Sequence, residues 1–162
     1  MKRLTLLVLI ALLTALVPVT ALAKGPAAKG TGGISIYEPW DGGHREVSFN
    51  AHEGDPAKGE MVDYVYGPDG ELRRVFKYTV YAVNVEDDTV YFGAYCWYDS
   101  EGAQTGQYLY VKAYDGGTPG TAGDAIGWRW GSQSAVTSWV NNDGATGWWR
   151  GAIAGNLVVH NK

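Results

Sequence analysis

The chain has little cysteine, little histidine and no cluster of basic residues. Its only cysteine is Cys96, so no intramolecular disulfide can form and packing must supply the stability of the fold. The three histidines, His44, His52 and His160, follow no His-Glu-x-x-His spacing, and no Cys-x-x-Cys pair is present. No Gly-x-Ser-x-Gly motif marks a serine nucleophile. The common signatures of zinc sites and serine hydrolases are therefore missing.

The first 23 residues have the layout of a secretory signal peptide. Lys2 and Arg3 precede a largely apolar run over residues 4–17, and Ala21 and Ala23 provide small side chains at a cleavage site. The run is shorter than the about 20 residues that a transmembrane helix needs. We expect cleavage after Ala23, a secreted or extracytoplasmic product, and no membrane span after processing.

The processed chain is acidic and long enough for one domain. Loss of Lys2 and Arg3 takes the formal net charge from −4 to −6, which argues against nucleic acid or an anionic membrane as a partner. Residues 24–33 are rich in glycine and alanine and carry no large apolar side chain, which predicts a flexible leader. A single β domain is expected over residues 34–162.

From Ile34 onward, apolar and aromatic residues alternate with polar residues at the period of two that is typical of β-strands. The segments between them are rich in turn-forming residues. The expected strands cover residues 34–38, 46–52, 61–66, 72–86, 89–98, 107–114, 125–130 and 152–160. The 72–86 run is long for one strand, so we expect it to bend or break.

The segment 135–140 is ambiguous. Ala135, Val136, Trp139 and Val140 recur at helical spacing, but the β-branched residues favour a strand, and we predict a strand here. With no long amphipathic helix elsewhere, the predicted fold is all-β, an antiparallel β-sandwich, with a closed antiparallel β-barrel as the alternative.

The stretch "SFNAHEGD" gathers polar residues that resemble an active site. On a strand, however, His52 and Glu53 project to opposite faces, so they are poor partners for acid–base chemistry. We interpret the stretch as the end of a strand followed by a loop. Cys96 shares an apolar strand face with Phe92 and Ala94, which predicts a buried and unreactive thiol.

Aromatic residues are the most unusual feature of the chain, with seven tryptophans and eleven tyrosines. Alternation places many of them on the face opposite the apolar one, and a large exposed aromatic face usually marks an interaction site. The residues expected to bind a ligand are Tyr91, Tyr95, Trp97, Tyr108, Tyr110 and Trp148. The alternative is that these rings form a second core layer.

The glycine-rich loop from Asp115 to Asp124 offers two carboxylates to a cation. Calcium needs about six to eight oxygen ligands, and the loop lacks the Asp-x-Asp spacing of an EF-hand. We favour a plain connection and no cofactor, with calcium at this loop as the alternative.

Three stretches carry a resemblance to a known group of proteins. "SFNAHEGDPAKGEM", "YDGGTPGTAGDAIGWRW" and "AIAGNLVVH" resemble a loosely defined group of bacterial secreted all-β proteins that is similar to the post-COAP-1 domain. The resemblance implies a secreted module of β-sandwich type with no assigned function, and it carries no catalytic residues onto this sequence.

These observations favour a secreted, non-enzymatic module that binds a polysaccharide or another extracellular protein through its aromatic face. One alternative is a secreted hydrolase that uses carboxylates such as Glu53 and Asp55 in an aromatic cleft. The other is a barrel that carries a small apolar ligand inside. An exposed row of rings, a pair of carboxylates in a cleft and an internal cavity distinguish the three.

Overall fold

The computed structural model describes residues 27–117, 122–142 and 149–161. They form eight strands and one helix, and each strand overlaps one that the sequence predicts. The elements are β1 (Lys29–Tyr37), β2 (His44–His52), β3 (Lys58–Tyr66), β4 (Leu72–Glu86), β5 (Thr89–Asp99), β6 (Tyr108–Tyr114), β7 (Ala125–Gly131), α2 (Gln133–Asn142) and β8 (Arg150–His160). The predicted all-β antiparallel fold is confirmed.

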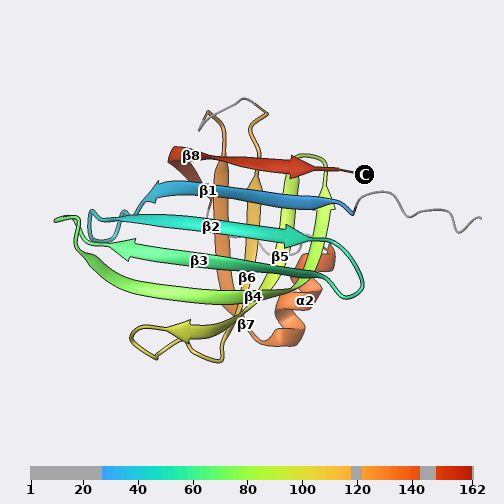
Figure 1. Cartoon of the computed structure of the whole chain (residues 1–162), viewed down its shortest axis with the longest axis horizontal. Coiled ribbons are helices and arrows are strands. Elements are labelled where there is room, and N and C mark those ends of the chain that lie inside the picture. The colour runs from blue at the N-terminus through green and yellow to red at the C-terminus, as the bar shows by residue number, and fades with distance from the viewer. Residues whose placement is uncertain (1–26, 118–121, 143–148, 162) are drawn as a thin grey trace, which may run out of the picture.

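The strands form one continuous sheet whose two ends meet. Each strand pairs with the next in antiparallel orientation, and β1 also pairs with β8, which gives the strand order of a closed barrel. The ring is flattened, so that β8, β1, β2 and β3 run across β5, β6 and β7 as two crossing layers (Figure 1). The molecule thus combines the pairing of a barrel with the layered interior of a sandwich.

The contact between β7 and β8 is the shortest in the ring. These strands share two residue pairs, Ala125 with Gly151 and Ile126 with Arg150, whereas β6 and β7 share seven. Beyond these pairs, the Ala152 backbone N–H donates to the Asp124 carbonyl oxygen at 2.9 Å, and side chains add contacts near this seam that matter for the site described below.

The main core lies between the two layers and follows the predicted alternation. Val47, Phe49 and Ala51 on β2 are buried, as are Phe92 and Cys96 on β5. Cys96 is fully buried, as predicted, and burial raises the pKa of its thiol to about 11, so the thiolate is scarce at neutral pH. β4 is a single strand, but its register against β5 shifts twice, between Lys77 and Tyr78 and between Val80 and Ala82, and its register against β3 shifts once, which accounts for its curvature.

β1 begins at Lys29, so residues 29–33 belong to the sheet although the sequence indicated a flexible leader. The small residues of this segment allow close packing against neighbouring parts of the barrel. A Cβ atom at Gly30 would meet Val90 Cγ1 at 2.3 Å, and one at Gly32 would meet the carbonyl oxygen of Asn156 at 2.6 Å. Glycine is required where β1 passes close to its neighbours.

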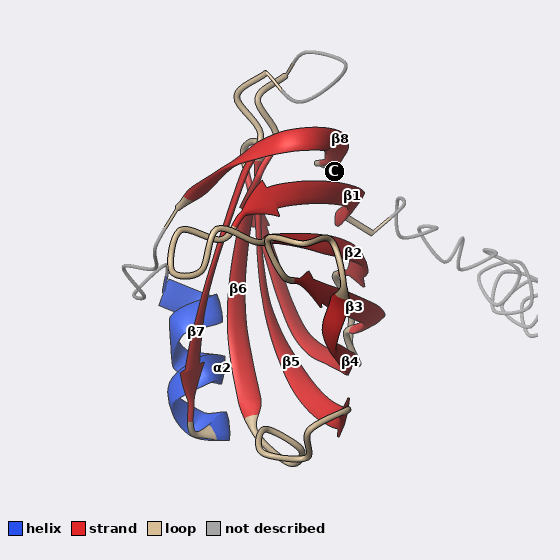
Figure 2. Ribbon diagram, turned by 90° about the vertical axis from the view of Figure 1, so that its left-hand side faces the viewer, coloured by secondary structure: helices blue, strands red, loops and turns tan. Residues whose placement is uncertain are grey.

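The strand predicted for residues 135–140 is wrong, because this segment lies in α2 (Figure 2). The Ser132 side chain accepts a hydrogen bond from the Ala135 backbone N–H at 3.3 Å, which caps the helix. Val136 and Val140, one helical turn apart, are both fully buried against the outside of the sheet. Capping and burial together outweigh the strand preference of the β-branched residues. Among the residues that the structure describes, no helix has the length and apolar character needed to span a bilayer.

Candidate functional site: a charged pocket at one end of the barrel

Charged side chains continue the inward-facing rows of β2, β3 and β4 at one end of the barrel. Asp63 lies two positions beyond buried Met61 on β3, and Arg74 lies two positions before buried Phe76 on β4. Arg45 takes the corresponding place before Val47 on β2. Because side chains alternate along a strand, these three residues point toward the barrel interior where apolar residues would otherwise stand.

Together they line a largely enclosed pocket of 130 Å³. Its wall joins charged, aromatic and aliphatic side chains from β2, β3, β4, β6 and β7 and from the turn after β5. The lining residues are Arg45, Val47, Met61, Asp63, Arg74, Phe76, Tyr78, Gln104, Leu109, Trp128 and Trp130. A small concave site with aromatic walls and a few polar groups is the usual form of a ligand pocket.

Asp63 is the most unusual residue of this pocket. It is 2% exposed, and its Oδ2 accepts a hydrogen bond from Arg45 Nη1 at 2.9 Å. Its Oδ1 is buried and has no hydrogen-bond partner among the described residues. Burial raises the pKa of Asp63 to about 6, a rise that the neighbouring Arg45 only partly offsets and that nearby Glu38 increases. A buried carboxylate oxygen without a partner is costly, and such groups concentrate at functional sites.

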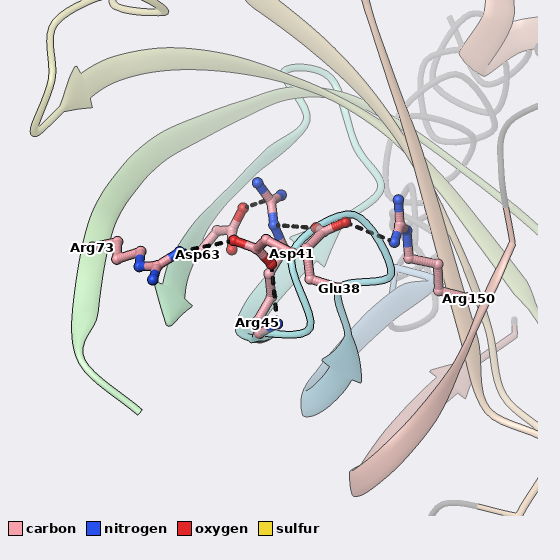
Figure 3. A network of polar contacts seen from close by, with 7 residues as sticks. Glu38, Asp41, Arg45, Asp63, Arg73 and Arg150 are labelled. Carbon is pink, nitrogen blue, oxygen red and sulfur yellow. Dashed lines mark hydrogen bonds and ion pairs between the residues drawn. The ribbon is translucent and has the colours of Figure 1, made fainter. Parts of the chain in front are cut away.

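Arg45 is held in place by a network of charged side chains from β2, β3, β8 and the residue after β1 (Figure 3). Its Nε lies 3.1 Å from Glu38 Oε2, and Glu38 Oε1 accepts a hydrogen bond from Arg150 Nη1 at 3.0 Å. The guanidinium carbons of Arg45 and Arg150 lie 5.0 and 5.1 Å from the ring centroid of Trp128. Side chains thus join β2, β8 and β7 where the backbone ladder between β7 and β8 is short.

Arg74 makes a different kind of contact, with Asp99. The two groups form a bidentate pair, with Nε to Oδ1 at 2.8 Å and Nη2 to Oδ2 at 2.6 Å. The backbone N–H groups of Glu101 and Gln104 also donate to Asp99. These hydrogen bonds hold the pKa of Asp99 well below its usual range and raise the pKa of Arg74. The pair holds the turn after β5, and Gln104 of this turn lines the pocket.

Aromatic rings form the apolar wall. The ring of Tyr78 lies 6.1 Å from that of Phe76 and 6.3 Å from that of Trp130, measured between centroids. Burial, together with the negative charge of nearby Asp63, raises the pKa of Tyr78, so its hydroxyl stays protonated. The pocket therefore offers flat apolar surfaces close to one carboxylate oxygen that lacks a donor.

The aromatic residues singled out in the sequence do not form one exposed surface. Tyr91 is 5% exposed and Tyr110 is fully buried, because both lie beneath α2 and pack against Val136 and Val140. This second core layer is the alternative weighed in the sequence analysis, and for these two residues the helix removes the expected contact with a ligand.

The other members of that set lie elsewhere. Tyr95 and Trp97 are 37% and 50% exposed, and half-buried Tyr108 contacts Tyr95 with 5.3 Å between ring centroids. Adjacent Tyr98 is also exposed. Trp148 lies outside the described residues. What is accessible is a short surface made of Tyr95, Trp97 and Tyr98, which we call the aromatic strip.

Asp115 and Asp124, the ends of the glycine-rich loop, bind backbone groups. Asp124 accepts hydrogen bonds from the N–H groups of Gly116 and Leu157, and Asp115 accepts them from Gly117 and Val159. Their oxygens fasten the loop to β8. Within residues 27–117, 122–142 and 149–161, no group of three or more His, Cys, Asp or Glu side chains is arranged to hold a metal ion.

The "SFNAHEGD" stretch lies away from the pocket. β2 ends at His52, and Glu53 and Asp55 follow in the loop to β3. His52 pairs with Lys58 at the start of β3, whereas Asp63 lies further along the same strand, opposite Val47. The residues considered for a hydrolase and the residues of the pocket therefore belong to different parts of the barrel.

Sequence reasoning missed Arg45, Asp63, Arg74 and Trp128. A signal was present for Asp63, which interrupts the apolar phase of Met61-x-Asp63-x-Val65, so a charge stands at a position that alternation assigns to the core. Arg45 and Asp63 meet because β2 pairs with β3, but the contact of Arg45 with Trp128 depends on the closure of the barrel. No family model matches the chain, and no curated protein and no solved structure matches it either.

Proposed function

We propose that this protein is a secreted, non-enzymatic binding module whose ligand site is the pocket at the end of the barrel. The observation that carries the proposal is Asp63, a carboxylate that is 2% exposed, lines the pocket and keeps one oxygen without a donor. A ligand that supplies this donor would remove the energetic penalty of the buried group. The signal-like N-terminal sequence supports action outside the cytoplasm.

The size of the pocket supports a small ligand. Its 130 Å³ is close to the about 150 Å³ of an engineered protein cavity that binds benzene. A molecule with one six-membered ring therefore matches the volume, and the rings of Trp128, Trp130 and Tyr78 match its flat shape. This is the carrier alternative of the sequence analysis, with a polar group added to the expected apolar interior.

A fragment screen tests this function. Single-ring compounds are added in pools at millimolar concentration to the uniformly ¹⁵N-labelled protein, and amide and indole shifts are recorded. We expect at least one compound to shift the Trp128 and Trp130 indole signals together with the Asp63 amide. If no compound perturbs these signals, or if all shifts map to other parts of the barrel, the proposed function fails.

The aromatic strip supports a second candidate, binding of a polysaccharide or an extracellular protein. Tyr95, Trp97 and Tyr98 are 37%, 50% and 41% exposed, which is unusual for three large aromatic residues so close in sequence. The Lys77 ammonium lies 5.7 Å from the Trp97 ring centroid and 5.4 Å from that of Tyr98, which adds a polar group at the edge of this surface. Sugar rings stack on such surfaces through their C–H faces.

Replacement of Trp97 by alanine tests this second candidate. Binding to an insoluble polysaccharide should weaken at least several-fold, while thermal unfolding should change little because half of the side chain is already in water. Tyr110→Ala is the matched control: it removes a fully buried ring under α2 and should destabilise the fold by about 3 to 5 kcal/mol. Equal destabilisation by the two variants would place Trp97 in the core and remove this candidate.

A further inference from the structure

We propose that the end pocket selects a neutral single-ring molecule with one hydroxyl group, a phenol, whose hydroxyl donates a hydrogen bond to Asp63 Oδ1. The inference rests on the binding function proposed for the pocket and names the chemical class of the ligand. It follows from three properties of the lining: which polar atoms already have partners, which charges are present, and how much space the rings leave.

The polar atoms of the lining leave one buried acceptor for a ligand. Arg45 forms ion pairs with Asp63 and Glu38, although its buried Nε makes no hydrogen bond among the described residues, and Arg74 forms ion pairs with Asp99 and Glu101. Among the described residues, Asp63 Oδ1 is the buried acceptor in the lining without a partner. The ligand group that completes this site is a hydrogen-bond donor, and an ether, a halide or a hydrocarbon does not supply one.

The charges of the lining disfavour ions of either sign. An anionic ligand would bring a second negative charge against Asp63, while both arginines of the lining already bind carboxylates. A cationic ligand would approach Arg45 Nη1, which lies 2.9 Å from Asp63 Oδ2, and Arg74 as well. Desolvation of the ion would add to either repulsion. A neutral donor avoids both.

The aromatic wall and the small volume favour one hydroxyl over several. Phe76, Tyr78 and Trp130 contact one another at centroid distances of 6.1 to 6.4 Å and present apolar faces. A monosaccharide has a similar ring size but carries several hydroxyl groups, and those that face these rings would lose water without gaining partners. A phenol places its single hydroxyl at Asp63 and its ring among the aromatic side chains.

Titrations of the intact protein with five compounds at pH 7.5 test the inference. The probes are phenol, toluene, benzoate, benzylamine and glucose, followed by the indole signals of Trp128 and Trp130. Asp63→Leu keeps the branching at Cγ and replaces both carboxylate oxygens by methyl groups, which removes the acceptor. Asp63→Asn keeps the volume and shape with a neutral, weaker acceptor in case the leucine variant does not fold. Trp97→Ala, outside the pocket, is the matched control.

Phenol should bind about 10-fold or more tightly than toluene, as expected for a hydrogen bond to a charged acceptor. This ratio should fall toward 1 in Asp63→Leu, fall in Asp63→Asn, and stay unchanged in Trp97→Ala. Binding of toluene, benzoate, benzylamine or glucose as tight as that of phenol would overturn the phenol inference while leaving the binding function intact. If none of the five probes binds and the fragment screen also finds no ligand for the pocket, both the phenol inference and the proposed binding function would be overturned.

Discussion

Asp63 and Asp99 are two buried aspartates that each face an arginine, and yet their environments act in opposite directions. Asp63 is 2% exposed and Asp99 is 5% exposed. Asp99 accepts four hydrogen bonds, two from Arg74 and two from backbone N–H groups, and its pKa lies well below the usual range. Asp63 accepts one from Arg45, and its pKa rises to about 6.

The difference shows how the number of donated hydrogen bonds, together with the depth of burial, separates a structural carboxylate from a candidate binding group. At Asp99 the donors outweigh the loss of water, so the charged form is favoured and the turn after β5 is held firmly. At Asp63 burial outweighs a single arginine, so the charged form is disfavoured and one oxygen stays available. A buried carboxylate oxygen that keeps this energetic penalty in the folded protein is a candidate for ligand binding.

Replacement of each aspartate by asparagine should give the largest contrast. Asp99→Asn breaks a buried bidentate pair and should lower the free energy of unfolding by about 3 kcal/mol. Asp63→Asn, its matched control, should change it by less than about 1 kcal/mol at pH 7.5, because Arg45 keeps Glu38 and a disfavoured charge is removed. Urea denaturation monitored by tryptophan fluorescence measures both. Equal losses would mean that Asp63 is as structural as Asp99.

The pH dependence of stability should sharpen the comparison with a smaller effect. The folded-state pKa of Asp63, about 6, exceeds the ordinary value of 3.8, so its contribution is complete below pH 3.8 and is lost as pH rises through 6. Between pH 7.5 and 5.0 this carboxyl should add about 1 kcal/mol of stability. Asp99 has a lowered pKa, so its contribution is constant in this window and is lost only as pH falls below 3.8.

The wild-type protein and Asp63→Asn, compared at pH 7.5 and pH 5.0, isolate this effect. The stability difference between them should shift by about 1 kcal/mol in favour of the wild type at the lower pH. A difference that does not depend on pH would contradict the raised pKa of Asp63.

An exposed ion pair should show the smallest effect. Arg73 and Asp41 lie 3.1 Å apart, a distance similar to those of the buried pairs, but their side chains are 45% and 40% exposed. Water and salt screen such a pair, so Arg73→Ala should cost between 0 and about 1 kcal/mol in urea denaturation. A loss as large as that of Asp99→Asn would show that distance alone sets the energy of these pairs.

Most of the fold could be predicted from the sequence because alternation is a local property. The boundaries of β4 are those expected, and β5 extends one residue beyond its prediction. The segments that were not predicted depend on their surroundings. Gly30 and Gly32 fit in β1 because residues of β5 and β8 lie close by, and α2 forms because Val136 and Val140 pack on an aromatic surface. The residues that these glycines and valines contact are distant from them in the sequence.

The site was far less accessible to sequence reasoning. Arg45 and Asp63 are 18 positions apart on the paired strands β2 and β3, whereas Trp128, 65 positions beyond Asp63, meets them only because the sheet closes on itself. The histidine and carboxylates of "NAHEGD" attracted attention because they are adjacent in sequence, yet they lie in a strand end and a loop. The aromatic face was recognised, but the helix that covers Tyr91 and Tyr110 was not.

A carboxyl ¹³C titration of the intact protein, with and without phenol, tests the central claim most directly. We expect Asp63 to titrate near pH 6 and Asp99 to titrate below its usual range. Saturating phenol should lower the pKa of Asp63, because a donated hydrogen bond favours the charged form, and should leave that of Asp99 unchanged. An Asp63 that titrates near 3.8, or whose pKa does not respond to phenol, would contradict the account.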